Sequence, residues 1–302
     1  MKVNVFNPNG PASPRMFVGR TKEIDALEKG LNQTRHGRQS NFLLTGRAGI
    51  GKSSIMNFVK KTIASDAKFN FLSIDILMSE KTTIFSLIIL IKKKIIREIK
   101  QIEATISPFT ESWMHSKFIS FVDSEIEHSL KIKAIDILID EAAYFLAKVC
   151  EEIKCFNKKK YDGIVFFIDE ADNASENLHI GYFFKVFTEL LEKNECRNIM
   201  FIVAGKPNVM EKLSRSHQSS VRVFSHLKIT ELTPDERKDV IDRGMEVSNE
   251  INLEKIEMSA QARNLISDLS EGCPHFIQRL GFSLLEENDN GEINKGDVEL
   301  AL

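Results

Sequence analysis

The chain has 302 residues, which is long for one domain and sufficient for two, and its hydrophobic content of 42% is enough to form a core. Its 41 basic and 43 acidic residues give a net charge of −2, which excludes a protein that binds nucleic acid through bulk positive charge alone. The four cysteines lack the paired spacing of a zinc site, and we expect free thiols in a cytoplasmic protein.

The first fifteen residues contain three prolines and one glycine, which predict an extended N-terminal segment, 1–15. Residues 1–14 hold one lysine and no apolar run, so we expect no signal peptide. The apolar stretch Leu87–Ile91, with near neighbours from Ile84, is far shorter than the roughly 20 residues that cross a bilayer. No contact with a membrane is therefore predicted.

From residue 16 onward the pattern predicts an α/β fold. A first helix has Ile24, Leu27 and Leu31 on one face and Thr21 as its expected N-cap. Short apolar runs then alternate with helical segments, an order typical of a parallel sheet. The predicted strands are 41–45, 69–76, 164–168, 199–203 and about 224–229.

Two regions depart from this alternation. Residues 81 to about 160 predict consecutive helices, at 84–104, about 110–130 and 134–156. After residue 232 only helices are expected, and the first begins with a capping box formed by Thr233 and Glu236. The helices expected after it are 259–270, 274–287 and 296–302.

A glycine-rich loop joins the first predicted strand to a helix. Glycines let successive backbone N–H groups point at phosphate oxygens, and the helix start adds its dipole. Lys52 can reach the β- and γ-phosphates, and the Ser53 hydroxyl can ligate Mg²⁺. A chance turn is the alternative, but the strand before and the helix after favour a site for ATP with Mg²⁺. The loop matches G-x-x-x-x-G-K-[ST] at Gly46, Arg47, Ala48, Gly49, Ile50, Gly51, Lys52 and Ser53.

Two acidic residues follow the apolar strand predicted at 164–168. Asp169 is placed to hold Mg²⁺ indirectly, as a Walker-B carboxylate does, and Glu170 to orient and deprotonate the attacking water. A strand end with two solvated acids is the alternative. The P-loop upstream favours the catalytic interpretation.

The P-loop, the Asp-Glu pair, the strand after it and the C-terminal helices together resemble an AAA+ ATPase. The closer likeness is to the origin-recognition-like and STAND-like branch. Phe17-Val18-Gly19-Arg20 with Glu23 looks like the F-V-G-R-x-x-E box near the adenine, and residues 272–278 look like the lid motif G-x-P-x-x-I-Q. The resemblance implies further nucleotide contacts from Val18, Arg20, Ser54, Pro274 and His275.

The same resemblance, which covers roughly residues 16 to 300, implies the fold. We expect a five-stranded parallel sheet in the order 5-1-4-3-2 with a C-terminal all-helical lid. The ATPase core would be 16–231, with a helical insertion at about 81–160, and the lid 232–302. The strands at 164–168 and 199–203 would be neighbours.

Two positions depart from the family pattern. The strand at 199–203 runs into Ala204-Gly205-Lys206, which leaves Lys206 as the only candidate for the polar sensor after that strand. The lid position that often carries arginine holds His275, and a packed lid residue and a phosphate contact both remain open for it. Both departures bear on the rate of hydrolysis rather than on binding.

Many relatives hydrolyse ATP at a subunit interface, where an arginine of the neighbour stabilises the transition state. Arg215 and Arg222 lie where such an arginine would, and the sequence around Arg222 favours it. A surface arginine is the alternative. A homo-oligomer or a complex with a protein partner is therefore expected.

Three functions follow. The first is a nucleotide-driven switch or motor subunit that hydrolyses ATP to ADP and phosphate. The second is a DNA-binding initiator or loader, and the lysine run 92–94 offers phosphate contacts, although such runs are usually solvated faces. The third is a nucleotide-binding scaffold in a signalling or defence complex that does not hydrolyse.

Overall fold

The computed structural model describes residues 3–65, 68–101, 107, 108, 111, 128–156, 160–288 and 291–302. The helix predicted at about 110–130 therefore lies almost wholly outside the described residues. The chain divides into two compact units. The first unit comprises Met1–Asp25, Gly46–Thr62 and Lys228–Leu302, and the second comprises Ala26–Thr45 and Ile63–Leu227.

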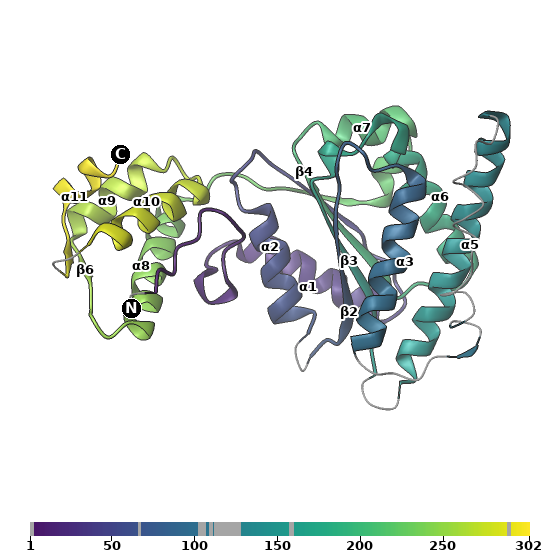
Figure 1. Ribbon diagram of the computed structural model, residues 1–302, viewed down its shortest axis with the longest axis horizontal. Coiled ribbons are helices and arrows are strands. Elements are labelled where there is room, and N and C mark those ends of the chain that lie inside the picture. Colours follow the sequence, from purple (N-terminus) through teal and green to yellow (C-terminus); the bar gives the residue numbers. More distant parts are fainter. Residues whose placement is uncertain are drawn as a thin grey trace. The chain divides into compact units, whose positions relative to one another are not determined.

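The second unit is built on a five-stranded parallel sheet with the order β2-β3-β4-β1-β5, of which β2, β3 and β4 are labelled in Figure 1. This confirms the order 5-1-4-3-2, counted from the opposite edge, and makes the strands β3 and β4 neighbours as predicted. The strands are β1 (Phe42–Thr45), β2 (Phe71–Leu77), β3 (Gly163–Asp169), β4 (Ile199–Gly205) and β5 (Ser225–Lys228).

The central strands of the sheet form where the sequence carries unbroken apolar runs, whereas the edge strand β5 is mostly polar and exposed. β3 and β4 are buried along almost their whole length, as parallel strands covered on both faces are. The pairing places Thr45 beside Gly205 and Ile168 beside Val203. Thr45, Asp169 and Gly205 therefore end their strands at one edge of the sheet, which we call the carboxyl edge.

Helices cover this sheet on both faces. One face carries the helices α3 (Ile84–Gln101), α5 (His128–Lys154), α6 (Ile180–Lys193) and α7 (Val209–Ser216) over an aromatic cluster. In that cluster Phe201 stacks on Phe166 at 5.1 Å and meets Phe184 edge-on at 5.6 Å. The other face carries α1 (Thr21–Arg35), where a Cβ on Gly30 would lie 2.3 Å from the ring of Phe42.

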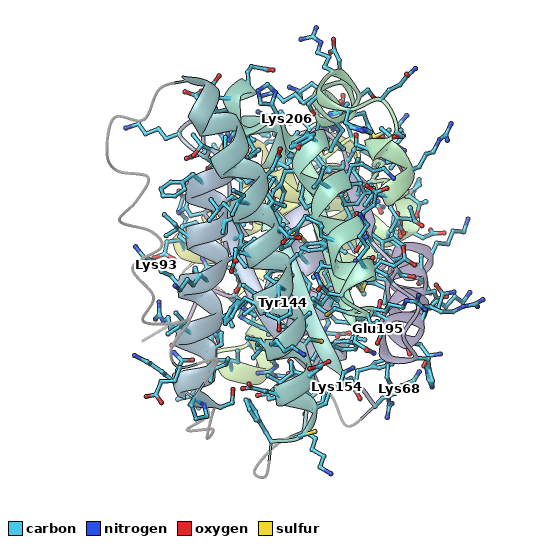
Figure 2. The ribbon with its side chains drawn as sticks, turned by 90° about the vertical axis from the view of Figure 1, so that its right-hand side faces the viewer. Lys68, Lys93, Tyr144, Lys154, Glu195 and Lys206 are labelled. Carbon is cyan, nitrogen blue, oxygen red and sulfur yellow. The ribbon has the colours of Figure 1, made fainter. Side chains whose placement is uncertain are left out.

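The lysine run of α3 is not the solvated face that its charge suggested. Lys92 lies on the inward face of the helix with only 5% of its surface exposed, and burial lowers its pKa. Lys93 points away from the body of the unit (Figure 2). The run therefore does not present three adjacent cations to a partner. No helix in the described part of the chain is both long and apolar enough to cross a membrane.

The first unit contains the C-terminal helices. They are α8 (Pro234–Ile251), α9 (Ala260–Leu269), α10 (Pro274–Glu287) and α11 (Lys295–Leu300), with the short parallel strands β6 (Glu257–Met258) and β7 (Glu292–Ile293). The predicted capping box is confirmed, since Thr233 and Glu236 exchange hydrogen bonds at the start of α8. The same unit holds α2 (Lys52–Phe58), which continues into a π-helical turn at Val59–Ile63.

The N-terminal segment is tied to these helices by a buried ring. Phe6 is 2% exposed, and it fills a notch between α8 and α10. The notch exists because glycine stands on both helices: a Cβ on Gly244 or Gly281 would lie 2.1 or 2.7 Å from the ring. Farther along, Ala12 donates its N–H to the Ser54 hydroxyl of α2 at 3.1 Å. One irregular segment thus contacts the C-terminal helices α8 and α10 as well as α2.

We expect Phe6→Ala to destabilise the protein by about 3–5 kcal/mol, because the two glycines leave nothing to fill the vacated notch. Chemical denaturation followed by circular dichroism measures this loss. Val3→Ala is the matched control, since Val3 belongs to the same segment and is 49% exposed. A loss below about 1 kcal/mol for Phe6→Ala, the size of a typical surface substitution, would show that the notch closes without the ring.

Candidate nucleotide-binding site

The P-loop of the first unit runs from Gly46 to the start of α2. Gly49 and Gly51 take the left-handed backbone conformation, with φ of +75° and +100°. Residues with side chains rarely adopt it, and turns of this kind gather backbone N–H groups into a concave nest for anions. Gly51 directly precedes α2, so the positive end of the helix dipole lies at the same place.

The Lys52 ammonium lies against this loop. Its Nζ donates hydrogen bonds to the carbonyl oxygens of Gly46 at 2.8 Å and Arg47 at 3.0 Å. Ser53 and Ser54 follow as the next residues of α2, and the Ser54 hydroxyl is turned to the N-terminal segment. Lys52 is therefore held at the loop, whereas Ser54 helps to fix the helix.

The lid motif contacts the P-loop directly. The backbone N–H of His275 donates to the Gly49 carbonyl at 3.2 Å, and the Cys273 thiol approaches the same oxygen at 3.7 Å. A Cβ on Gly49 would lie 2.9 Å from that of His275, and one on Gly51 would lie 3.7 Å from Pro274. Within the described part of the chain, the His275 ring itself has no hydrogen-bond partner. Glycine in the loop thus also permits the close approach of the 272–278 motif.

Arg20 joins the predicted box to both of these elements. Its guanidinium donates to the Ile50 carbonyl at 3.2 Å, and its backbone N–H donates to Glu236 Oε1 at 3.0 Å. Burial lowers the pKa of Arg20, although Glu23 and other carboxylates oppose the shift. The prediction of Thr21 as N-cap was wrong: Arg20, with φ of +60°, precedes α1, and its carbonyl accepts the first helical hydrogen bond, from Ile24.

Glu236 connects the box to the lid. Burial opposes the ionisation of Glu236, but hydrogen bonds from Arg20 and Thr233 outweigh it, and the pKa of Glu236 is lowered. Because the pKa of Glu236 is lower in the folded state than in the unfolded state, the ionised side chain stabilises the fold at pH values above the ordinary glutamate pKa of about 4.3. This contribution to stability is lost as the pH falls through the folded-state pKa. The contact also explains Gly19, where a Cβ would lie 2.8 Å from Glu236 Oε1.

We therefore expect Glu236→Gln to lower the melting temperature by a few degrees at pH 7, because a charge-assisted acceptor becomes a neutral one. Thermal unfolding of both proteins between pH 7 and pH 3 should show the difference shrinking toward acid. Glu254→Gln, at an exposed glutamate without an ion pair in the described structure, is the control. A difference that stays constant with pH would contradict the assignment.

The acidic pair lies in the second unit, at the carboxyl edge. After Asp169 the chain turns through Glu170, whose φ of +55° is uncommon for a residue other than glycine, into a short 3₁₀ helix, η4 (Ala171–Asn173). The Glu170 N–H donates to Asp169 Oδ1 at 2.8 Å, and Asn173 Nδ2 donates to Glu170 Oε2 at 3.0 Å. The P-loop leaves this same edge of the sheet, because Gly46 directly follows Thr45 in the chain.

Lys206, the sensor candidate, is engaged by a residue of η4. Asp172 is 8% exposed, and its carboxylate accepts the Lys206 N–H at 3.0 Å and pairs with Nζ at 3.3 Å. A Cβ on Gly205 would lie 3.1 Å from the Asp172 backbone nitrogen, so a side chain there would push the turn away by a few tenths of an ångström. The end of β4 is thus clamped to the turn that follows β3.

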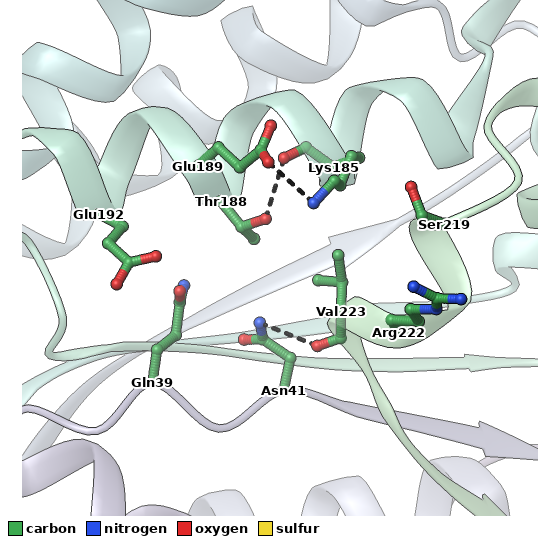
Figure 3. A pocket seen from close by; sticks show the side chains of 9 residues that line it. All are labelled: Gln39, Asn41, Lys185, Thr188, Glu189, Glu192, Ser219, Arg222 and Val223. Atoms are coloured by element: carbon green, nitrogen blue, oxygen red, sulfur yellow. Dashed lines mark hydrogen bonds and ion pairs between the residues drawn. The ribbon is translucent and has the colours of Figure 1, made fainter.

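Arg222 lies elsewhere in the second unit, in the 3₁₀ helix Ser220–Val223 that precedes β5. It lines a polar cavity of about 430 Å³ with residues of α6 and with Asn41, which precedes β1 (Figure 3). These segments lie at the amino ends of the strands, opposite the carboxyl edge. Among the described residues the Arg222 guanidinium has no ion-pair partner. Arg222 is therefore not brought together with Asp169 and Glu170 of its own chain.

The sequence analysis did not identify three of the residues that make these contacts: Asp172, Asn173 and Glu236. Glu236 was recognised only as part of a capping box, which uses one oxygen of its carboxylate. The motif does not reveal that the other oxygen accepts a hydrogen bond from the Arg20 backbone. Asp172 and Asn173 stand next to the acidic pair, which is a usable signal, but their roles depend on a turn whose left-handed residue is Glu170.

The family of the chain is shown by comparison. A model of the AAA ATPase domain matches residues 16–186, more than half of the sequence. An uncharacterised HTH-type transcriptional regulator of Methanocaldococcus jannaschii is 25% identical over 282 residues, covering 92% of this chain and 65% of that protein. The chain thus spans slightly less than two thirds of the length of this curated relative.

Solved structures share the fold at low identity. The ORC2 protein of Aeropyrum pernix, in ADPNP–ADP complexes, matches with a TM-score of 0.60 at 15% identity, covering 99% of this chain and 71% of that chain. A Walker-type ATPase of Pyrococcus abyssi matches with 0.56 at 14% identity, covering 94% and 72%. With the P-loop, the order of the sheet and the family match in agreement, the chain belongs to the AAA ATPase domain family.

Proposed function

We propose that this protein binds ATP at the P-loop and hydrolyses it as a nucleotide-driven switch or motor subunit of a larger assembly. The observation that carries the proposal is the hydrogen bond from His275 to the Gly49 carbonyl. A phosphate that enters the loop would act on a backbone that the lid already contacts. Nucleotide state and lid position are coupled in this way, which is what a switch requires.

Phosphate binding would use the nest around Gly49 and Gly51, the Lys52 ammonium and the start of α2. Val18 and Arg20 of the box and Pro274 and His275 of the lid motif complete the proposed nucleotide contacts. Their support is that Arg20, Pro274 and His275 all adjoin the P-loop within the first unit.

Magnesium is proposed to bind to the Ser53 hydroxyl, and the Asp169 carboxylate is proposed to hold it indirectly. Mg²⁺ prefers oxygen ligands, and it is commonly held by one or two protein groups together with waters and the phosphates of the substrate. When bound, the ion neutralises charge on the β- and γ-phosphates. Asp169 stands at the end of β3, and its Oδ1 accepts the Glu170 N–H, which restrains the carboxylate.

For hydrolysis, Glu170 accepts a proton from the attacking water. The water oxygen bonds to the γ-phosphorus, the bond from the γ-phosphorus to the β–γ bridging oxygen breaks, and ADP and phosphate leave. Arg222 would stabilise the transition state on the nucleotide of a second copy. Its place at the edge opposite Glu170 supports action in trans rather than in its own chain.

The rate of ATP hydrolysis as a function of protein concentration tests this proposal. We expect the turnover per chain to rise with concentration, because Arg222 acts only after assembly, and Arg222→Ala should remove the rise. Arg215→Ala is the matched control, since Arg215 is paired with Glu211 on α7. If ATP is bound but its turnover per chain does not change with protein concentration, Arg222 does not act on the nucleotide of a second copy.

A DNA-binding initiator or loader is the second candidate. It is favoured by the HTH-type transcriptional regulator that is similar in sequence. Stimulation of the ATPase rate by duplex DNA would support it.

A nucleotide-binding scaffold without hydrolysis is the third candidate function, and the ion pair of Lys206 with Asp172 favours it. An ATPase rate that stays at background under all conditions would support it.

A further inference from the structure

The turn after β3 contains a residue that the proposed chemistry does not yet use. Asn173 ends η4, and its side-chain amide donates to Glu170 Oε2 at 3.0 Å, while its backbone N–H donates to the Glu170 carbonyl at 2.9 Å. Asn173 thus contacts both the backbone and the carboxylate of one residue. Among the described residues, the other carboxylate oxygen of Glu170, Oε1, has no hydrogen bond or ion pair.

We propose that Asn173 is a positioning residue that holds Glu170 by one oxygen and leaves the other to accept the proton of the attacking water. This rests on the proposed role of Glu170 in hydrolysis. An exposed glutamate side chain samples several rotamers, and restraining one oxygen reduces this freedom before the reaction begins. The amide suits the role because it donates without carrying a charge that would neutralise the base.

The support for Asn173 extends to β4. Asp172, its neighbour in η4, is buried and accepts both the backbone N–H and the ammonium of Lys206. On the other side, Lys212 of α7 donates to the Ala174 carbonyl at 2.8 Å. The turn is therefore fixed at two points that flank Asn173. Lys206, in this arrangement, acts on the turn rather than on the nucleotide.

The test compares turnover and nucleotide affinity. Asn173→Ala should lower kcat by about tenfold to 100-fold, the range expected when a general base is misplaced but present. The KM for ATP and the Kd of a fluorescent ATP analogue should stay within twofold of wild type. Asn173→Asp keeps the shape but sets a carboxylate against Glu170, and it should lower kcat further. Asn177→Ala, at an exposed asparagine of the next turn, is the control.

A double-mutant cycle separates positioning from general damage. In the Glu170→Gln background there is no base to position, so adding Asn173→Ala should cause no further loss. Wild-type kcat in Asn173→Ala, or a full additional loss in the double variant, overturns the proposal. Wild-type protein that binds the analogue but shows no turnover overturns it as well, together with the role of Glu170. Failure to bind the analogue at all would instead refute the proposed function.

Discussion

Lys52→Ala should weaken ATP binding by on the order of 100-fold or more, to the point where no complex forms at micromolar nucleotide. The lysine is proposed to contribute charge-assisted hydrogen bonds to the β- and γ-phosphates, each worth about 1.5–3 kcal/mol, and every 1.4 kcal/mol changes the dissociation constant tenfold. Titration of a fluorescent ATP analogue, with isothermal calorimetry as a second method, measures the loss.

A control is needed because Lys52 also has a structural role. Its Nζ donates to the Gly46 and Arg47 carbonyls, so its removal leaves two loop oxygens without that donor. Lys61→Ala removes an exposed lysine from the π-helical turn after α2, and it should leave affinity unchanged. Unchanged affinity in Lys52→Ala itself would refute the central assignment of the P-loop.

The fold was predictable because its signals are local. The strands β1, β3 and β4 are runs of apolar residues that are buried on both faces, as the Ile164–Ile168 run shows, and the capping box at Thr233 needs only four residues. The edge strand β5 lacks this signal, because its residues Ser225–Lys228 are mostly polar and exposed. The order of the sheet came from the family resemblance. Periodicity failed where burial depends on a distant partner: Phe6 lies in an irregular segment, and its notch is made by two glycines more than 200 residues away.

The candidate site, like the fold, was predictable from the sequence only where its signals are local. The P-loop and the Asp-Glu pair are continuous motifs, and the sequence identifies them without any knowledge of packing. Lys92 was misjudged because composition reports charge and not the side of the helix on which it falls. Asn173 and Asp172 were missed because their contacts depend on the left-handed backbone of Glu170, which no residue preference at that position announces.

Glu170→Gln should retain ATP binding and lose hydrolysis by about 100-fold to 10,000-fold, the contribution of a general base. Glutamine is close in size to glutamate, and its amide oxygen can still accept the hydrogen bond that Asn173 donates, so the turn after β3 should persist. It cannot accept a proton from water. Single-turnover measurements with ATP in complex separate the chemical step from binding.

This variant also discriminates between the three functions, because it holds the nucleotide in the unhydrolysed state. In a switch or motor subunit, the lid of this variant should stay in its ATP-bound position. Hydrogen exchange would show this as sustained protection of the His275 amide, which donates to the Gly49 carbonyl. Glu176→Gln, at an exposed glutamate whose ion pair with Lys212 is long at 3.7 Å, is the matched control and should turn over normally. Equal turnover in Glu170→Gln and wild type would transfer the role of base to another residue and would leave the P-loop as the one functional assignment of the chain.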